Sequence, residues 1–185
     1  VLLHAIAHIE LNAIDLAWDL IARFREQSMP STFFDDWVRV ADDEARHFLL
    51  LEQRLRELGS FYGEWPAHDG LWEAAEDTRH DLRARLAIVP LVLEARGLDV
   101  TPAMIQRFRS AGDKITAEIL ETILAEEIDH VRAGHRWFEA LCRSHNQEPS
   151  AHFKHLLRQH YKGRIKPPFN VAARAQAGLP PEYYS

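Results

Sequence analysis

Residues 43–48 read Asp-Glu-Ala-Arg-His-Phe, and residues 126–131 read Glu-Glu-Ile-Asp-His-Val. Each stretch holds a glutamate followed three positions later by a histidine: Glu44 with His47, and Glu127 with His130. Residues three apart share a helix face, so this spacing puts a carboxylate beside an imidazole. About one such motif is expected by chance at this composition, so the motif alone is weak evidence for a site. The neighbouring residues and the spacing of the glutamates must support it.

Two further glutamates stand where a helical pattern calls for an apolar residue. Glu10 is flanked one turn away by Ile6 and Ile14, and Glu94 is followed one turn later by Leu98. The glutamates of the two motifs have apolar neighbours at the same spacing, so four carboxylates are expected to face the core. A buried carboxylate is costly unless it is paired or bound to metal, and divalent metal would also relieve the repulsion among the four.

The four glutamates are evenly spaced. The separation of Glu10 from Glu44 nearly equals that of Glu94 from Glu127, so the chain repeats a helix pair. Two such antiparallel pairs would bring all the ligands into one core, and carboxylate oxygen with imidazole nitrogen suits iron, with manganese as the alternative. We predict a two-metal site with no catalytic residue beyond its ligands. Those ligands are Glu10, Glu44, His47, Glu94, Glu127 and His130.

Neighbouring acidic residues offer rival ligands and hydrogen-bond partners. Glu126 is adjacent to Glu127, but its polar neighbours Thr122 and Asp129 place it on the solvent side. Asp43 stands beside Glu44 in the same way, either behind the ligands or on the surface. Metal-bound histidines usually donate their second ring N–H to an acceptor, and we name Asp129 and Asp15 as candidates for that role.

The rest of the pattern is helical, and alternating β-branched runs are nearly absent. We expect Ser31 and Asp113 to act as N-caps, and Gly59 and Gly97 to end helices. A short helix beginning at Pro102 would be capped by Thr101. The four expected long helices cover residues 3–27, 31–58, 71–96 and 113–144, with a further helix near 149–162.

These elements predict an all-α fold, namely a ferritin-like four-helix bundle with an added C-terminal helix and an irregular tail. The connection between the second and third helices is the longest, and a single crossover is typical of the ferritin-like arrangement. We expect the bundle to occupy residues 1–146, with residues 147–185 packed on it. Because Val1 runs straight into a helical pattern, we expect the native N-terminus to lie upstream.

Composition narrows the class of protein. With 185 residues, 46% of them hydrophobic, the chain is long enough for one domain with a sizeable core. No apolar stretch approaches the roughly 18 residues of a membrane span, and no secretory signal opens the chain. The single cysteine, Cys142, excludes an internal disulfide framework and suits a reducing compartment. We expect a cytoplasmic protein that does not engage a membrane.

The net charge of −6 is unevenly distributed. Residues 149–181 contain no acidic residue, and one explanation is a solvated basic tail packed against an acidic body. The alternative is a docking surface for an anionic partner, such as nucleic acid or an acidic protein. The basic residues of this segment are Lys154, Arg158, Lys162, Arg164, Lys166 and Arg174.

Beyond the two motif stretches, residues 7–17 read Ala-His-Ile-Glu-Leu-Asn-Ala-Ile-Asp-Leu-Ala, and residues 93–102 read Leu-Glu-Ala-Arg-Gly-Leu-Asp-Val-Thr-Pro. Together these four strings resemble an uncharacterised bacterial ferritin-like family, a domain of unknown function. That family is similar to the di-iron tRNA hydroxylases that oxidise an isopentenyl-modified adenosine. The resemblance covers most of residues 3–146. The tail after residue 150 fits the uncharacterised family better than the hydroxylases.

The leading functional hypothesis is an O₂-dependent oxidoreductase with two iron ions. It would hydroxylate or desaturate a small molecule or a modified nucleoside. No flavin or nicotinamide motif is visible, so electrons would come from an external donor protein. One alternative is a ferroxidase or iron-handling protein, which would need a cage of many subunits. The other is a metal-stabilised binding module whose segment 149–181 docks an anionic partner, since one bundle serves many functions.

Overall fold

The computed structural model describes residues 1–184, and the regular structure within them is entirely helical, as predicted. None of these helices is both long enough and apolar enough to cross a membrane. The elements are α1 (Leu2–Arg23), α2 (Ser31–Glu57), α3 (Gly70–Asp77), α4 (Leu82–Ile88), the π-helix η1 (Val89–Glu94), α5 (Ala95–Ser110), α6 (Lys114–Ser144), α7 (Pro149–His160), α8 (Val171–Gln176) and the 3₁₀-helix η2 (Pro181–Tyr183).

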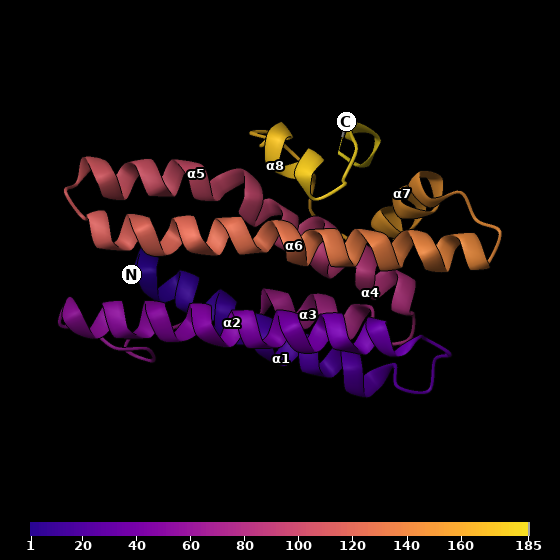
Figure 1. Cartoon of the computed structure of the whole chain (residues 1–185), viewed down its shortest axis with the longest axis horizontal. Helices are drawn as coiled ribbons and strands as arrows, with labels where there is room; N and C mark the ends of the chain where they lie inside the picture. Colours follow the sequence, from indigo (N-terminus) through magenta and orange to yellow (C-terminus); the bar gives the residue numbers. More distant parts are fainter. Residues whose placement is uncertain (185) are drawn as a thin grey trace.

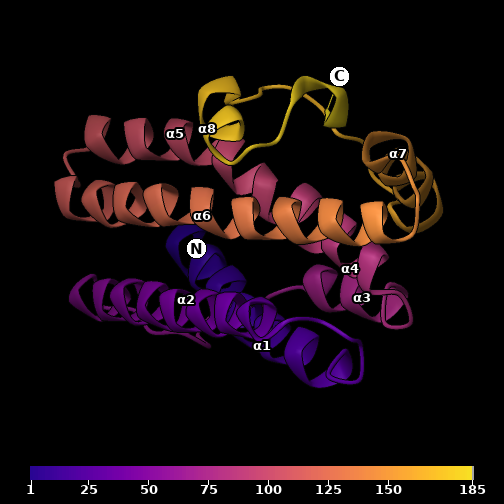
Figure 2. The same cartoon turned by 45° about the vertical axis from the view of Figure 1, so that its right-hand side comes forward.

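Four long rods form the body of the molecule. Helix α1 packs antiparallel to α2, and the continuous rod α4–η1–α5 packs antiparallel to α6 (Figures 1 and 2). The two pairs meet where α2 lies against α6. This contact is important for the site because each of these two helices carries one Glu-x-x-His motif.

The apolar core of the bundle is divided along its length. One cluster of buried side chains contains Phe33, Trp37 and Phe138, and a second contains Leu51, Leu120 and Ile123. On α1, α2 and α6, the proposed ligands lie between residues of one cluster and residues of the other. The bundle therefore surrounds a layer of polar side chains with apolar packing on both sides.

The bounds predicted for the third helix, residues 71–96, were wrong. Helix α3 ends at Asp77, a turn follows, and the next rod runs unbroken from Leu82 to Ser110. Neither Gly97 nor Pro102 interrupts it, and Thr101 is buried within the helix instead of capping one. Two other predicted boundaries shift slightly: Ser31 is the first helical residue after an N-cap at Pro30, and α1 ends at Arg23.

The helix continues past Pro102 because a distant residue compensates for the missing N–H. Proline at 102 leaves the carbonyl of Leu98 without its usual intrahelical donor. The Asn170 side chain, far along the chain, donates its Nδ2–H to this carbonyl at 3.2 Å. Two other predicted signals are confirmed locally. Asp113 caps α6 by accepting a hydrogen bond from the backbone N–H of Thr116 at 3.0 Å, and Gly59 follows α2 with φ of 78°.

Pro90 lies inside η1 and packs directly on α6. A Cβ atom added to Gly134 of α6 would lie 2.4 Å from the Pro90 Cβ, a distance that no side chain tolerates. Glycine at 134 therefore lets the two helices approach closely. A proline inside a helix removes a backbone N–H, and a π-helical turn is one way of absorbing the disruption. Glu94 is the last residue of this wide turn.

The C-terminal segment packs on the second helix pair. Helix α7 contacts α4 and α6, and α8 contacts α5 and α6, on the side of α6 away from α1 and α2 (Figures 1 and 2). Arg174 of α8 forms a buried ion pair with Asp99 of α5 at 2.7 Å. The backbone N–H of Asn170 also donates to Asp99 at 2.9 Å, so one carboxylate holds this segment at two points.

Candidate metal centre

The six predicted ligands come from all four rods of the bundle. Glu10 lies on α1, Glu44 and His47 on α2, Glu94 at the end of η1, and Glu127 and His130 on α6. Five are buried as whole residues, and Glu94 is half-buried. We call these six residues the polar layer.

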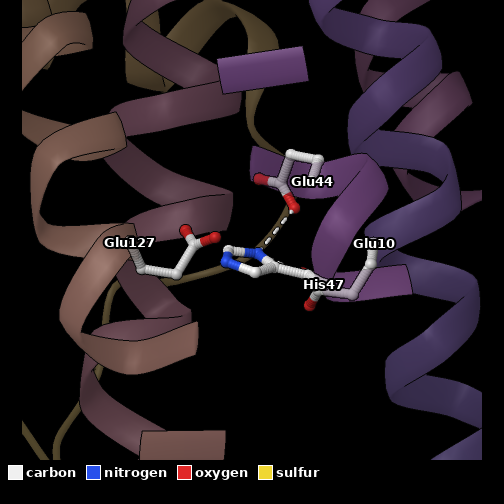
Figure 3. Close-up of side chains that lie close together, drawn as sticks. All are labelled: Glu10, Glu44, His47 and Glu127. Atoms are coloured by element: carbon white, nitrogen blue, oxygen red, sulfur yellow. Dashed lines mark hydrogen bonds and ion pairs between the residues drawn. The ribbon is translucent and has the colours of Figure 1, made fainter. Parts of the chain in front are cut away.

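Four members of the polar layer form one compact group. The side chains of Glu10, Glu44, His47 and Glu127 each offer a ligand atom, and these atoms lie within 4.8 Å of one another, so the group could hold a metal ion. The His47 Nδ1 is 3.1 Å from Glu10 Oε2 and 3.4 Å from Glu44 Oε2. Figure 3 shows Glu127 reaching toward His47 from the opposite side of the bundle.

The second histidine adjoins this group through shared carboxylates. His130 Nδ1 lies 3.1 Å from Glu44 Oε1 and 3.2 Å from Glu127 Oε1. Glu44 therefore presents one oxygen to each imidazole, and the two rings are 5.9 Å apart between centroids. A carboxylate placed in this way between two nitrogen donors could serve in a metal ligand set together with either imidazole.

Two oxygens in the polar layer are buried without a hydrogen-bond partner among residues 1–184. They are Oε2 of Glu44, which makes a 3.4 Å ion-pair contact with His47 Nδ1, and Oε2 of Glu94. Buried polar atoms in native proteins are nearly always satisfied, and an unsatisfied one costs free energy. Glu94 lies outside the compact group of four but lines the same cavity as Glu10, Glu44 and Glu127. Unsatisfied carboxylate oxygens beside imidazole nitrogens are the donor set that a divalent cation would complete.

Burial and mutual repulsion shift the pKa values of the polar layer. Burial, followed by the charge of Glu44, raises the pKa of Glu10 to about 8. Burial and the charge of Glu127 raise the pKa of Glu94 well above its ordinary value. Burial lowers the pKa of His47, but its close contacts with the carboxylates of Glu10 and Glu44 outweigh burial and raise that pKa to about 10. Without metal, protons thus compensate the crowded carboxylates.

The outer nitrogen of each histidine faces a carboxylate on the opposite helix. His47 Nε2 is 2.6 Å from Glu126 Oε2, and His130 Nε2 is 3.3 Å from Asp43 Oδ2. Each acceptor directly precedes the motif glutamate of its own helix, so the two contacts mirror each other across the α2–α6 interface. Arg46 pairs with both Asp43 and Glu126 and joins the two contacts.

Sequence reasoning had assigned these roles differently. Glu126 was placed on the solvent side, but it contacts a buried histidine. Asp129, proposed as a histidine acceptor, instead pairs with Arg132 on its own helix. For Asp15, the other candidate, no histidine contact is found among residues 1–184. The sequence did offer one signal for Glu126, namely that it is adjacent to the motif glutamate Glu127. A residue next to a buried position in a helix often lies at the edge of the helix interface.

An apolar cavity of about 180 Å³ opens beside the polar layer, between α1, η1–α5 and α6. Its polar wall consists of the carboxylates of Glu10, Glu44, Glu94 and Glu127 together with Arg96 and Thr101. Most of its remaining wall is aliphatic, including Ile6, Leu93, Val100, Met104 and Ile123. The cavity therefore brings an apolar guest directly against the carboxylates.

The opposite side of the polar layer has a different character. A second cavity of about 180 Å³ lies between α2 and α6 and reaches His130. Charged side chains line most of it, including Asp36, Asp43, Glu126 and Arg132. The polar layer thus has one apolar side and one charged side, and an organic molecule and a hydrated ion would approach it from different directions.

Comparison with known proteins places the chain in a family without assigning an activity. The chain is 42% identical over 182 residues to an uncharacterised protein of Haemophilus influenzae. The match covers 96% of this chain and 63% of that relative, so the chain spans somewhat less than two thirds of the relative's length. No solved structure matches the chain. A family model matches residues 1–185, and the chain therefore belongs to the family described as Protein of unknown function (DUF455).

Proposed function

We propose that this protein is a ferritin-like, two-metal carboxylate oxidoreductase that uses iron and O₂ to hydroxylate or desaturate an organic substrate. The observation that carries the proposal is the shared wall between the polar layer and the apolar cavity. Four carboxylates of the polar layer line that cavity, and Oε2 of Glu94 is buried without a hydrogen-bond partner among residues 1–184. An organic group in the cavity would therefore lie next to the metals.

The donor set fits two cations. His47 with Glu10 supplies one end, and His130 with Glu127 and Glu94 supplies the other. Glu44 lies between the two histidines, and carboxylate with imidazole suits non-haem iron, with manganese as the competitor. When bound, reduced iron would supply the reactivity toward O₂ that oxidation of an unactivated C–H bond requires.

The residues around the polar layer have separate tasks in this proposal. The aliphatic wall, including Ile6, Val100 and Met104, binds the apolar part of the substrate and excludes water. The cavity volume of about 180 Å³ is slightly larger than the roughly 150 Å³ engineered cavity that accommodates benzene. We therefore expect a substrate that inserts a compact apolar group rather than a long chain.

The residues on the charged side of the polar layer orient the two histidines. Asp43 and Glu126 hold the outer nitrogens of the histidines and keep each Nδ1 turned toward the carboxylates. Electrons would come from an external donor protein. The aliphatic cavity favours this oxidoreductase over an iron-storage protein, because iron oxidation for storage has no need of an apolar binding site.

The test is the reaction of the iron-loaded protein with oxygen. The chain is loaded with ferrous iron without air, mixed with O₂, and followed by oxygen consumption and visible absorbance. The proposal expects stoichiometric O₂ uptake and an absorbance change, both absent in Glu44→Ala. A matched Glu52→Ala variant, changed on the same helix outside the polar layer, should behave as the parent protein. Loaded protein that is inert toward O₂ would contradict an oxidoreductase.

The size of the protein in solution distinguishes the proposed oxidoreductase from an iron-storage protein. Light scattering of the iron-loaded protein should report a small species, because the proposed reaction needs only one bundle. A closed shell of many subunits that accumulates far more than two irons per chain would favour iron storage instead.

A further inference from the structure

A third cavity shares no lining residue with the polar layer. It has a volume of about 460 Å³ and is formed by α7, the loop that follows it, and the end of the described chain. Both views show α7 close to the C-terminus, across α6 from α1 and α2 (Figures 1 and 2). We call it the basic cleft. The residues that give it its chemistry are Lys154, Arg158, Arg164, Tyr161, Tyr183 and Tyr184.

Charge is the first distinctive feature of the basic cleft. Three cationic side chains line it, and no carboxylate among residues 1–184 does. Within residues 1–184, no carboxylate pairs with Lys154, Arg158 or Arg164, although most arginines elsewhere in the protein are paired. Lys162 of the same segment, for comparison, lies 3.8 Å from Asp77. Uncompensated positive charge converging on one concave surface favours an anionic ligand.

Aromatic rings are the second feature, and their positions are fixed by packing. Tyr183 is buried against Phe153, with 4.8 Å between the ring centroids. The guanidinium of Arg174 lies 4.5 Å from the ring centroid of Tyr184, and Arg174 is itself held by its buried ion pair with Asp99. The cleft is therefore built on a rigid base, although its cationic side chains are solvent-exposed.

Tyr161 is held closely by the turn that follows α7. A Cβ atom added to Gly163 would lie 2.6 Å from Cζ of the Tyr161 ring. Glycine at this position therefore allows the backbone to pass directly against the ring. Tyr161 is half-buried and lines the cleft, so part of its ring remains available to a ligand.

We propose that the basic cleft binds a nucleotide unit, with its phosphate held by Arg158, Arg164 and Lys154 and its base against Tyr161. Arginine forks bind phosphate oxygens in a bidentate manner, and a planar base stacks on an aromatic side chain. The volume falls within the usual range for small-ligand sites, roughly 300–1,000 Å³. This proposal is independent of the metal centre, because no residue of the polar layer lines the cleft.

The test measures binding of adenosine monophosphate to the whole chain by calorimetry at low salt, beside adenosine and inorganic phosphate. The nucleotide should bind more tightly than either part. Arg158→Ala with Arg164→Ala should weaken nucleotide binding by about tenfold or more, because two charge-assisted contacts are lost. The matched control is Lys162→Ala with Lys166→Ala, which removes the same charge from the same segment outside the cleft and should change the affinity little.

Two further arms identify the base contact and the source of the nucleotide. Tyr161→Leu should weaken binding of the nucleotide but not of phosphate, and Tyr161→Phe should retain it. A short single-stranded oligonucleotide that binds more tightly than the mononucleotide, and loses affinity in the arginine variant, would assign the nucleotide unit to a strand. Circular dichroism confirms that each variant is folded.

Three results would overturn the proposal. The first is that neither the mononucleotide nor the oligonucleotide binds. The second is an equal loss of affinity in the lysine control, which would show that only overall charge attracts the ligand. The third is phosphate binding as tightly as the nucleotide, which would show that the rings take no part.

Discussion

His47 Nε2 lies 2.6 Å from the carboxylate of Glu126 on the facing helix. The mirrored contact joins His130 Nε2 to Asp43. Each motif therefore supplies a glutamate to the polar layer and, one position earlier, an acceptor for the histidine of the other motif. This reciprocity ties the orientation of both imidazoles to the correct packing of α2 against α6.

The first prediction concerns these acceptors. Glu126→Ala removes the partner of His47 Nε2 and should weaken iron binding by about 10–100-fold, the usual effect of losing such a partner. Glu126→Gln keeps an acceptor oxygen and should lose less. Competition with a chelator of known affinity measures both. Glu121→Gln, on the exposed side of α6, serves as the control, and an unchanged affinity in Glu126→Ala would remove any role for this contact.

The second prediction compares two helical glycines, one crowded by a neighbouring helix and one facing open space. Gly134→Ala would push its Cβ to 2.4 Å from Pro90 and should lower the free energy of unfolding by about 1–3 kcal/mol. Gly97→Ala meets nothing within 4 Å and should raise it by about 0.5–1 kcal/mol, since alanine favours the helix. Urea unfolding of the metal-free protein compares them. Equal effects of the same sign would contradict the close approach of η1 and α6.

The third prediction is a pH dependence of the metal-free protein. The pKa of Glu10 is raised to about 8 and that of His47 to about 10, so the folded protein holds protons that the unfolded chain has released at neutral pH. Stability from these groups is present at low pH and is lost as pH rises through their folded values. Each such proton should lower the free energy of unfolding by up to about 1.4 kcal/mol per pH unit, up to about pH 8 for Glu10 and up to about pH 10 for His47.

Iron should reverse this trend, because metal and protons compete for the same atoms. Binding at neutral pH should release protons, which a weakly buffered titration detects directly. A Glu10→Gln variant, which cannot release its proton, should show a shallower pH dependence of unfolding when metal-free. A metal-free protein that gains stability from pH 7 to 10 would contradict the assigned protonation.

The fourth prediction separates the apolar cavity from the metals. Val100→Trp places a large ring in the cavity and should abolish binding of a small apolar probe such as benzene, while leaving the iron content unchanged. Saturation-transfer NMR detects the probe, and Val38→Trp, at an exposed position on α2, is the control. Persistent benzene binding in Val100→Trp would show that the probe occupies another site.

Much of this architecture could be predicted from the sequence. The positions of Glu10 and Glu94 in apolar stripes placed them on the core side of their helices, and the repeated spacing indicated two helix pairs. The structure brings Glu10, Glu44, His47 and Glu127 into one group, with His130 adjoining it. Whether these residues bind metal stays a prediction. Local periodicity sufficed for this placement because it depends only on which face of each helix is buried.

Features that depend on distant residues could not be predicted in this way. Gly97 carries a strong local signal for ending a helix and Pro102 for beginning one. In the structure one helix runs through both, and the Leu98 carbonyl finds its donor in Asn170, more than sixty residues later. Glu126 was misplaced for the same reason, since its partner His47 lies on another helix. Tertiary hydrogen bonds override local propensity at such positions, and one sequence does not reveal them.

Metal content tests the central claim most directly. The chain is produced with iron available and analysed element by element, beside a variant carrying Glu127→Ala and His130→Ala and a control carrying Glu118→Ala and Glu121→Ala on the same helix. The account predicts about two irons per chain in the parent and the control, and loss of iron in the polar-layer variant. A folded parent protein with no bound metal under these conditions would contradict it, and the polar layer would then be a buried network held by protons alone.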